Sequence, residues 1–140
     1  MPFQLHLMLQ NDCFLVGESS LCQLLLMNDS RYPWFILVPK KENITEIFQL
    51  SEDEQIEVQK TSSFLSEQLY NIFKADKMNI AALGNMCPQL HIHHIVRYKT
   101  DDAWPSPIWG QHPAIPYTEN QKQALIEKLS PQLSTVFQLL

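Results

Sequence analysis

The segment PQLHIHHIVRY, residues 88–98, decides how this chain is interpreted, because it places three histidines within four positions among aliphatic and β-branched residues. This composition, following a proline that can only open a strand, predicts a β-strand. Side chains alternate between the two faces of a strand, so Gln89, His91 and His93 share one face, while Leu90 and Ile92 share the other. Successive side chains on one face are about 7 Å apart, which predicts a functional site made of two imidazoles and a carboxamide.

A metal ion is the alternative ligand for this segment, since neutral imidazole is the commonest metal ligand in proteins. A zinc site normally needs further Cys or His ligands at close spacing. The chain contains no Cys-x-x-Cys, and Cys87 follows a different alternation from the histidines. We therefore expect no bound metal. His6, His94 and His112 have no polar partner at matching spacing, so we expect them to be packed or exposed residues outside the site.

Length, composition and charge limit the class of protein to which this chain can belong. A chain of 140 residues has the size of one domain with a real core, so we expect a single domain over 1–140. It has no apolar run long enough to cross a bilayer and no signal-like start, and its three cysteines have no disulfide-framework spacing, which favours a cytoplasmic protein without a membrane partner. The net charge of −5 argues against binding nucleic acid, which needs a basic surface.

The order of elements predicts the α+β class. Strand-like runs occupy residues 3–9, 13–19, 20–28, 34–39 and 77–83, and the last of these forms an antiparallel hairpin with the histidine strand. Ser51 and Glu54 form a capping box that starts one long helix over about 52–73. Its apolar stripe is expected to be buried and consists of Ile56, Phe64, Leu65, Leu69, Ile72 and Phe73. Residues 99–117 are loop-like, and a closing helix capped by Thr118 is expected to break or kink near Pro131.

The sequence GNMCPQLHIHHIVR, residues 84–97, resembles the signature of the histidine triad (HIT) superfamily, His-φ-His-φ-His-φ-φ followed shortly by Arg. A register that starts at His91 would put Ile95 in the third position. The register anchored on Gly84 and Arg97 aligns Gln89, His91 and His93 with the triad without a gap, and it agrees with the strand-face argument.

Two further segments carry the resemblance. LLMNDSRYPWFILVPK, residues 25–40, resembles the strand-loop-strand that holds a ribose-contacting Asn, here Asn28, and NIAALGN, residues 79–85, resembles the hairpin before the triad. Together with DDAWPSPIWG, residues 101–110, these segments cover most of residues 13–110. As a set they most resemble the bacterial diadenosine-tetraphosphate-hydrolase-like branch. Trp34 stands where several relatives place a histidine of the nucleoside pocket; an indole there either stacks on a base or belongs to the core.

The resemblance implies a HIT-like fold, with a five-stranded antiparallel sheet, one long helix and a C-terminal helix, assembled as a homodimer. It also implies that His91 attacks the α-phosphorus of a dinucleoside polyphosphate or related nucleotide and forms a nucleotidyl-histidine. His93 and Gln89 would donate to the phosphate oxygens, and Asn85 would contact the phosphate or ribose. No cofactor is implied, although the substrate can carry Mg²⁺ on its phosphates.

The glutamine at the first triad position departs from the family pattern. A relative, galactose-1-phosphate uridylyltransferase, has a glutamine at the other end of its triad, so Gln89 does not exclude activity. Hydrolysis and transfer to an acceptor other than water both stay open. The alternative from another class is a nucleotide-binding or sensing module in which the altered triad binds with little turnover.

Overall fold

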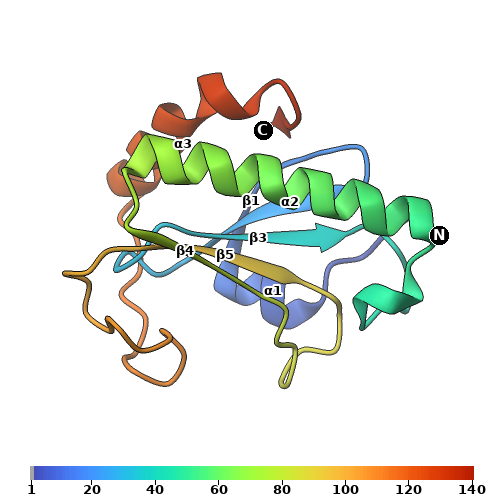
Figure 1. Cartoon of the computed structure of the whole chain (residues 1–140), viewed down its shortest axis with the longest axis horizontal. Coiled ribbons are helices and arrows are strands. Elements are labelled where there is room, and N and C mark those ends of the chain that lie inside the picture. Colours follow the sequence, from blue (N-terminus) through green and yellow to red (C-terminus); the bar gives the residue numbers. More distant parts are fainter. Residues whose placement is uncertain (1) are drawn as a thin grey trace.

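A six-stranded sheet forms the centre of the molecule in this computed structural model, which describes residues 2–140. The strands lie in the order β4-β5-β3-β2-β1-β6, and every neighbouring pair is antiparallel (Figure 1). Their bounds are β1 Cys13–Glu18, β2 Cys22–Met27, β3 Trp34–Pro39, β4 Lys77–Ala81, β5 Ile92–Arg97 and β6 Gln138–Leu139. The helices are α1 Leu7–Asp12, α2 Glu52–Phe73 and α3 Glu119–Leu133, with a 3₁₀ turn, η1, over Ile47–Gln49. The predicted α+β class is confirmed.

The two long helices begin where their capping residues predict. Ser51 Oγ accepts the Glu54 N–H, and the Glu54 carboxylate accepts the Ser51 N–H, so α2 spans the predicted range. Thr118 caps α3 in the same way, through Gln121. α3 continues through Pro131 to Leu133, so the helix is not broken there. One expectation about these helices was wrong, because Ile56 is exposed on α2.

The edge of the sheet beside β1 differs from the expectation. Residues 3–9 do not form a strand; His6 caps α1 by accepting the Met8 N–H on its ring Nδ1 at 3.1 Å. The place beside β1 is taken by β6, which makes the sheet six-stranded instead of five-stranded. Gly17 permits this close pairing, because a Cβ at that position would lie 2.5 Å from the Gln138 carbonyl oxygen. No local signal in the two residues of β6 marks them as a strand.

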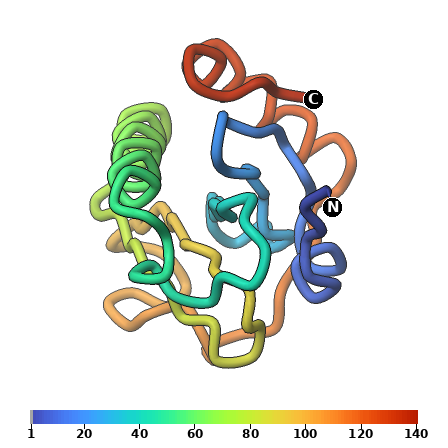
Figure 2. Tube along the Cα trace, turned by 90° about the vertical axis from the view of Figure 1, so that its right-hand side faces the viewer, coloured from blue at the N-terminus to red at the C-terminus, as the bar shows by residue number. Residues whose placement is uncertain are grey.

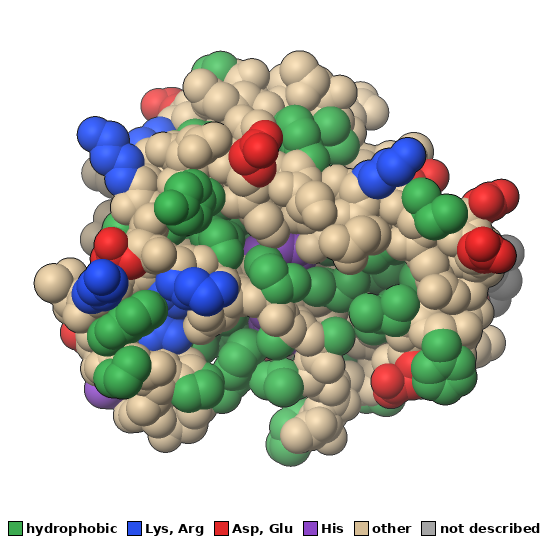
Figure 3. Space-filling view, viewed as in Figure 1, with side chains coloured by type: hydrophobic (Ala, Val, Ile, Leu, Met, Phe, Trp, Pro, Cys, Tyr) green, Lys and Arg blue, Asp and Glu red, His purple; other side chains and the backbone are tan. Residues whose placement is uncertain are grey.

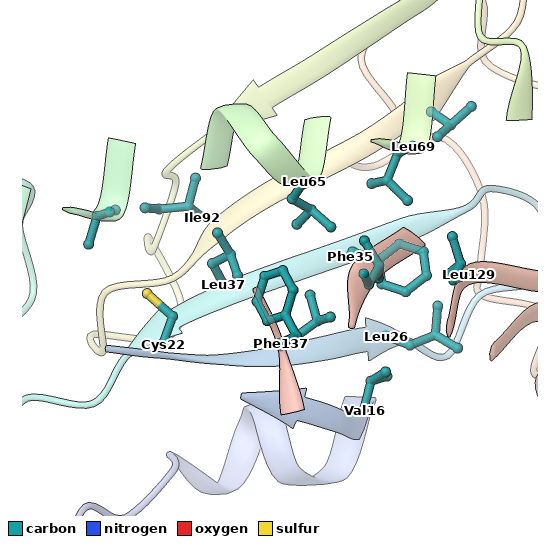
Figure 4. Close-up of a cluster of buried hydrophobic side chains, with 14 of the residues drawn as sticks. Val16, Cys22, Leu26, Phe35, Leu37, Leu65, Leu69, Ile92, Leu129 and Phe137 are labelled. Atoms are coloured by element: carbon teal, nitrogen blue, oxygen red, sulfur yellow. The ribbon is translucent and has the colours of Figure 1, made fainter. Parts of the chain in front are cut away.

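Two apolar clusters cover the two faces of the sheet. On one face, α2 and α3 pack Leu65, Leu69 and Leu129 against alternate strand residues such as Phe35 and Leu37 (Figure 4). On the other face, Leu9 of α1 packs with Trp34, Ile36 and Ile95. Figure 2 shows α2 and α1 on opposite sides of the strands. Because β3 is buried on both faces, its apolar run is continuous instead of alternating.

In the β4–β5 hairpin, β4 is the edge strand and the histidine strand β5 lies between β4 and β3. The antiparallel pairing of the hairpin is confirmed, with Ala81 opposite His93, but the connection spans residues 82–91 and is longer than the short turn that was expected. Gln89 and His91 therefore lie just before β5 instead of inside it. At the far end of β5, the buried guanidinium of Arg97 bonds both carboxylate oxygens of Asp101 and the Ser106 carbonyl. These bonds hold the loop that follows, residues 99–117, over the sheet.

Candidate active site

His91 is held in a defined tautomer by the backbone next to it. Its Nδ1 lies 2.7 Å from the carbonyl oxygen of Gln89. A carbonyl oxygen only accepts hydrogen bonds, so Nδ1 carries the proton of the neutral ring. The Nε2 atom then has a free lone pair, which is the form of imidazole that attacks an electrophile.

His93 is held in the opposite tautomer by a neighbouring strand. Trp34 is on β3, and its indole Nε1–H donates to His93 Nδ1 at 2.9 Å. The proton of the neutral ring therefore lies on Nε2, where it can be donated. Burial, and after it the nearby His91 and His94, lower the pKa of His93 to about 3, so this ring is neutral at physiological pH.

The two imidazoles share one cavity of about 300 Å³, here called the imidazole cavity. Their ring centroids are 4.9 Å apart, and His91 and His93 are only 7% and 4% exposed. Trp109, from the loop held by Arg97, closes over His93 with a centroid distance of 5.1 Å. The rest of the wall includes Met8 and Leu9 of α1, Cys87 and Asn85. One ring in the wall of this cavity thus has a free Nε2 lone pair and the other has an Nε2–H, and most other residues of the wall are apolar.

A second cavity of about 390 Å³ adjoins the first and shares Asp12, Met27 and Trp109 with it. Asn28 and Trp34 line this adjoining cavity. The Oδ1 of Asn28 accepts the backbone N–H of Tyr117 at 2.8 Å, which orients the amide and leaves its NH₂ group as the available donor. A ligand larger than a phosphate can therefore extend from the imidazoles into the adjoining cavity.

The residues expected from the sequence are only partly brought together. His91, His93 and Asn85 line the imidazole cavity, and Asn28 and Trp34 line the adjoining one. Gln89 is held elsewhere: its Oε1 accepts the His6 N–H at 2.8 Å, and its Nε2 donates to the Gln4 carbonyl at 3.0 Å. Both ends of the Gln89 amide, which was expected to donate to a phosphate, are therefore bonded to the backbone. A backbone segment 85 residues away in sequence competes for this amide.

Trp34 and Trp109 show what sequence reasoning missed. Trp34 was expected to stack on a base or to be plain core, but its indole is 8% exposed and serves as the hydrogen-bond donor to His93. Trp109 was not predicted as a site residue. The available signal was its position as an aromatic residue in a Pro- and Gly-rich loop close behind the histidine strand. His94 faces the opposite side of the sheet, where its Nε2 lies 2.7 Å from Ser62 Oγ.

Within residues 2–140, no group of three or more His, Cys, Asp or Glu side chains is arranged to hold a metal ion. None of the helices in this part of the chain is both long enough and apolar enough to span a membrane. The absence of a bound metal in the working protein and its cytoplasmic location stay predictions.

Known proteins place this arrangement in a family. The HIT domain family model matches residues 8–100. Among solved structures, a histidine triad protein from Marinobacter aquaeolei VT8 is 51% identical, with 97% of this chain and 99% of that chain covered and a TM-score of 0.95. Histidine triad proteins from Bradyrhizobium japonicum and Sinorhizobium meliloti 1021 are 38% and 37% identical, with TM-scores of 0.92 and 0.91. They cover 94% of this chain, and 98% and 97% of their own chains are covered. No curated protein matches the chain.

An antiparallel α+β fold with two tautomerically fixed imidazoles at the start of one strand defines the class to which this molecule belongs. The family match and the three structural relatives agree with it, and the chain belongs to the HIT domain family, whose members are nucleotide-binding hydrolases and transferases.

Proposed function

We propose that this chain hydrolyses a dinucleoside polyphosphate or a related nucleotide through a covalent nucleotidyl-histidine. His91 Nε2 attacks the α-phosphorus, a nitrogen–phosphorus bond forms, and the bond to the leaving oxygen breaks with its electron pair. Water then attacks the same phosphorus and releases the nucleotide and the imidazole. The observation that carries this proposal is the hydrogen bond of His91 Nδ1 to the Gln89 carbonyl, which leaves Nε2 as a nucleophile.

His93 supplies the complementary group in this proposal. Its Nε2–H, fixed by Trp34 at Nδ1, donates to a non-bridging phosphate oxygen as negative charge develops there. Because its pKa is about 3, His93 is neutral at physiological pH and donates this hydrogen bond as an uncharged ring. In this proposal Asn85, which lines the imidazole cavity, contacts the phosphate, and the NH₂ group of Asn28, which lines the adjoining cavity, contacts the ribose.

Trapping of the intermediate tests this mechanism. The protein is mixed with diadenosine tetraphosphate, quenched within one turnover and analysed by mass spectrometry for an added nucleotidyl group. His91→Ala should abolish the labelled protein and remove at least about three orders of magnitude of rate, as loss of a covalent nucleophile does. His94→Ala is the control, because this ring lies on the opposite face of the sheet, and it should retain labelling.

Labelling that survives in His91→Ala but disappears in His93→Ala would show that the other register of the triad is correct. The same experiment separates two further functions. Transfer to an acceptor other than water would give a labelled protein that persists until the acceptor is added. A binding module would hold the nucleotide without label or product, and the commitment of the Gln89 amide to the N-terminal backbone is the observation that favours this alternative.

We also propose that two copies of the chain associate through the β4 edge of the sheet. β4 is an edge strand, and Ile80 on it is 47% exposed. Between β4 and α2 lies a groove of about 230 Å³ lined by Ile47 and Ile80, and Phe48 beside it is 77% exposed. Figure 3 shows apolar side chains gathered across the middle of this face. An unpaired edge next to exposed apolar groups is a surface that proteins normally cover.

Light scattering coupled to gel filtration tests this association. The wild type should elute with twice the chain mass, and Ile80→Lys should elute as a monomer that keeps its far-UV circular dichroism. Gln123→Lys is the control, because it adds the same charge at an exposed position on α3, and it should leave the mass unchanged. A wild type with the mass of one chain would refute the proposal.

A further inference from the structure

Gln89 ties two distant parts of the chain together. Both ends of its amide are occupied by backbone groups near the N-terminus: Oε1 accepts the His6 N–H at 2.8 Å, and Nε2 donates to the Gln4 carbonyl at 3.0 Å. The two bonds go to residues two apart in the chain, so a single carboxamide holds that stretch at two points. An ionised carboxylate at position 89 could not make both bonds, because it only accepts and the pair requires one acceptor and one donor.

The stretch that Gln89 holds leads directly into the wall of the imidazole cavity. His6, which gives its N–H to Gln89, is also the N-cap of α1 through the bond from the Met8 N–H to its ring. Two residues further on, Met8 and Leu9 line the imidazole cavity, and Asp12 lines both cavities. We call residues 3–9 the N-terminal segment. Gln89 is therefore bonded to the segment that forms one wall of the imidazole cavity.

The same geometry places the Gln89 amide outside the imidazole cavity. Among residues 2–140, the wall of the imidazole cavity contains His91, His93 and Asn85 but not Gln89. Gln89 lines two neighbouring cavities: one, with Phe48, also reaches His91, and the other is lined by His6 and Asn43. Its backbone carbonyl, in contrast, faces His91 Nδ1 at 2.7 Å. The backbone of residue 89 thus serves the nucleophile, while its side chain serves the N-terminal segment.

We infer that Gln89 is a positioning residue for nucleotide binding, which acts by holding the N-terminal segment as one wall of the site, and that it is not a donor to the phosphate. This inference rests on the proposed function of the two imidazoles. It implies that the glutamine at the first triad position determines how tightly the nucleotide is bound, whereas His91 and His93 determine the rate of the chemical step.

Gln89→Met tests the inference, because methionine has nearly the same length and shape but no amide. The backbone carbonyl of residue 89 stays available to His91. Losing two hydrogen bonds to a wall of the site should raise KM for diadenosine tetraphosphate by about tenfold. The kcat should stay within about twofold of the wild type. Backbone amides of His6, Met8 and Leu9 should exchange with deuterium about tenfold faster, measured without nucleotide. Gln123→Met, a glutamine exposed on α3, is the control and should change none of these quantities.

Two results would overturn the inference. A fall in kcat of about 10²–10³ with unchanged KM and unchanged amide exchange would make Gln89 a donor to the phosphate. Unchanged KM and unchanged exchange with unchanged kcat would show that the two bonds do not position the segment. If the wild type hydrolyses no nucleotide, the proposed function fails. The role of Gln89 is then tested by amide exchange and by the Kd for AMP. Faster exchange and weaker AMP binding in Gln89→Met then support the inference, and no change in exchange refutes it.

Discussion

The buried histidines make the stability of this protein depend on pH in a way that one substitution isolates. His94 is completely buried between α2 and the sheet, with Ser62 Oγ at 2.7 Å and no acidic partner among its hydrogen bonds. Burial lowers the pKa of His94 to about 4, and burial together with the other histidines lowers the pKa of His93 to about 3. His94→Gln removes one of these two groups without touching the wall of either cavity.

The expected effect follows from the difference in proton binding between the two states. In the unfolded chain a histidine titrates near pH 6.5, so on acidification the unfolded state takes up protons that the folded state refuses. The contribution of each buried histidine is therefore complete above pH 6.5 and is lost as the pH falls from there toward the folded pKa. Each pH unit costs about 1.4 kcal/mol per histidine, so pH 5 costs about 2 kcal/mol for one and about 4 kcal/mol for both.

Urea unfolding at pH 8 and pH 5 measures this loss. The wild type should lose about 4 kcal/mol of unfolding free energy between the two pH values through His93 and His94, and His94→Gln should lose about 2 kcal/mol less. Comparing each protein with itself removes any change that the substitution makes at both pH values. His112→Gln, at an exposed position, should lose as much as the wild type. A His94→Gln protein that keeps the full pH dependence would refute the reasoning.

Three further predictions concern the site and the loop that covers it. Trp34→Phe removes the donor to His93 Nδ1, so kcat should fall about tenfold with a smaller change in KM, and an unchanged kcat in steady-state assays would show that the indole does not control the donor. Asp101→Asn leaves the buried charge of Arg97 without its partner and should cost about 3–5 kcal/mol in urea unfolding. Asp102→Asn, at the exposed pair with Arg31, should cost less than about 1 kcal/mol, and equal costs would contradict the argument from burial. Exhaustive chelation of zinc should leave activity intact, and one equivalent of tightly bound zinc per chain in elemental analysis would contradict the expected absence of a metal.

Several parts of the fold were predictable because their signals lie within a few residues of one another. The capping box at Ser51 and Glu54 located the start of α2, and the apolar run between Pro33 and Pro39 located β3. The alternation of side chains at the start of β5 paired His91 with His93, and the structure brings their rings to one cavity. In each case the deciding interaction is local, so the sequence pattern and the structure contain the same information.

Other parts depend on contacts between residues far apart in the chain, and no local pattern contains them. The alternating apolar residues of 3–9 suit a strand, but Leu9 packs against residues of β2, β3 and β5, and part of this stretch forms α1. β6 exists because Gly17, more than a hundred residues earlier, leaves room for it.

The candidate site also has one part determined by neighbouring residues and another determined by residues far apart in the chain. The sequence by itself determined that two imidazoles share a face at the start of β5, because alternation along a strand is a property of neighbouring residues. Which nitrogen of His93 carries the proton depends on Trp34, 59 residues away, and what Gln89 holds depends on residues 83 and 85 positions away. Hydrogen bonds of this kind form only after the chain has folded, so only the tertiary structure decided the tautomer of His93 and the partners of Gln89.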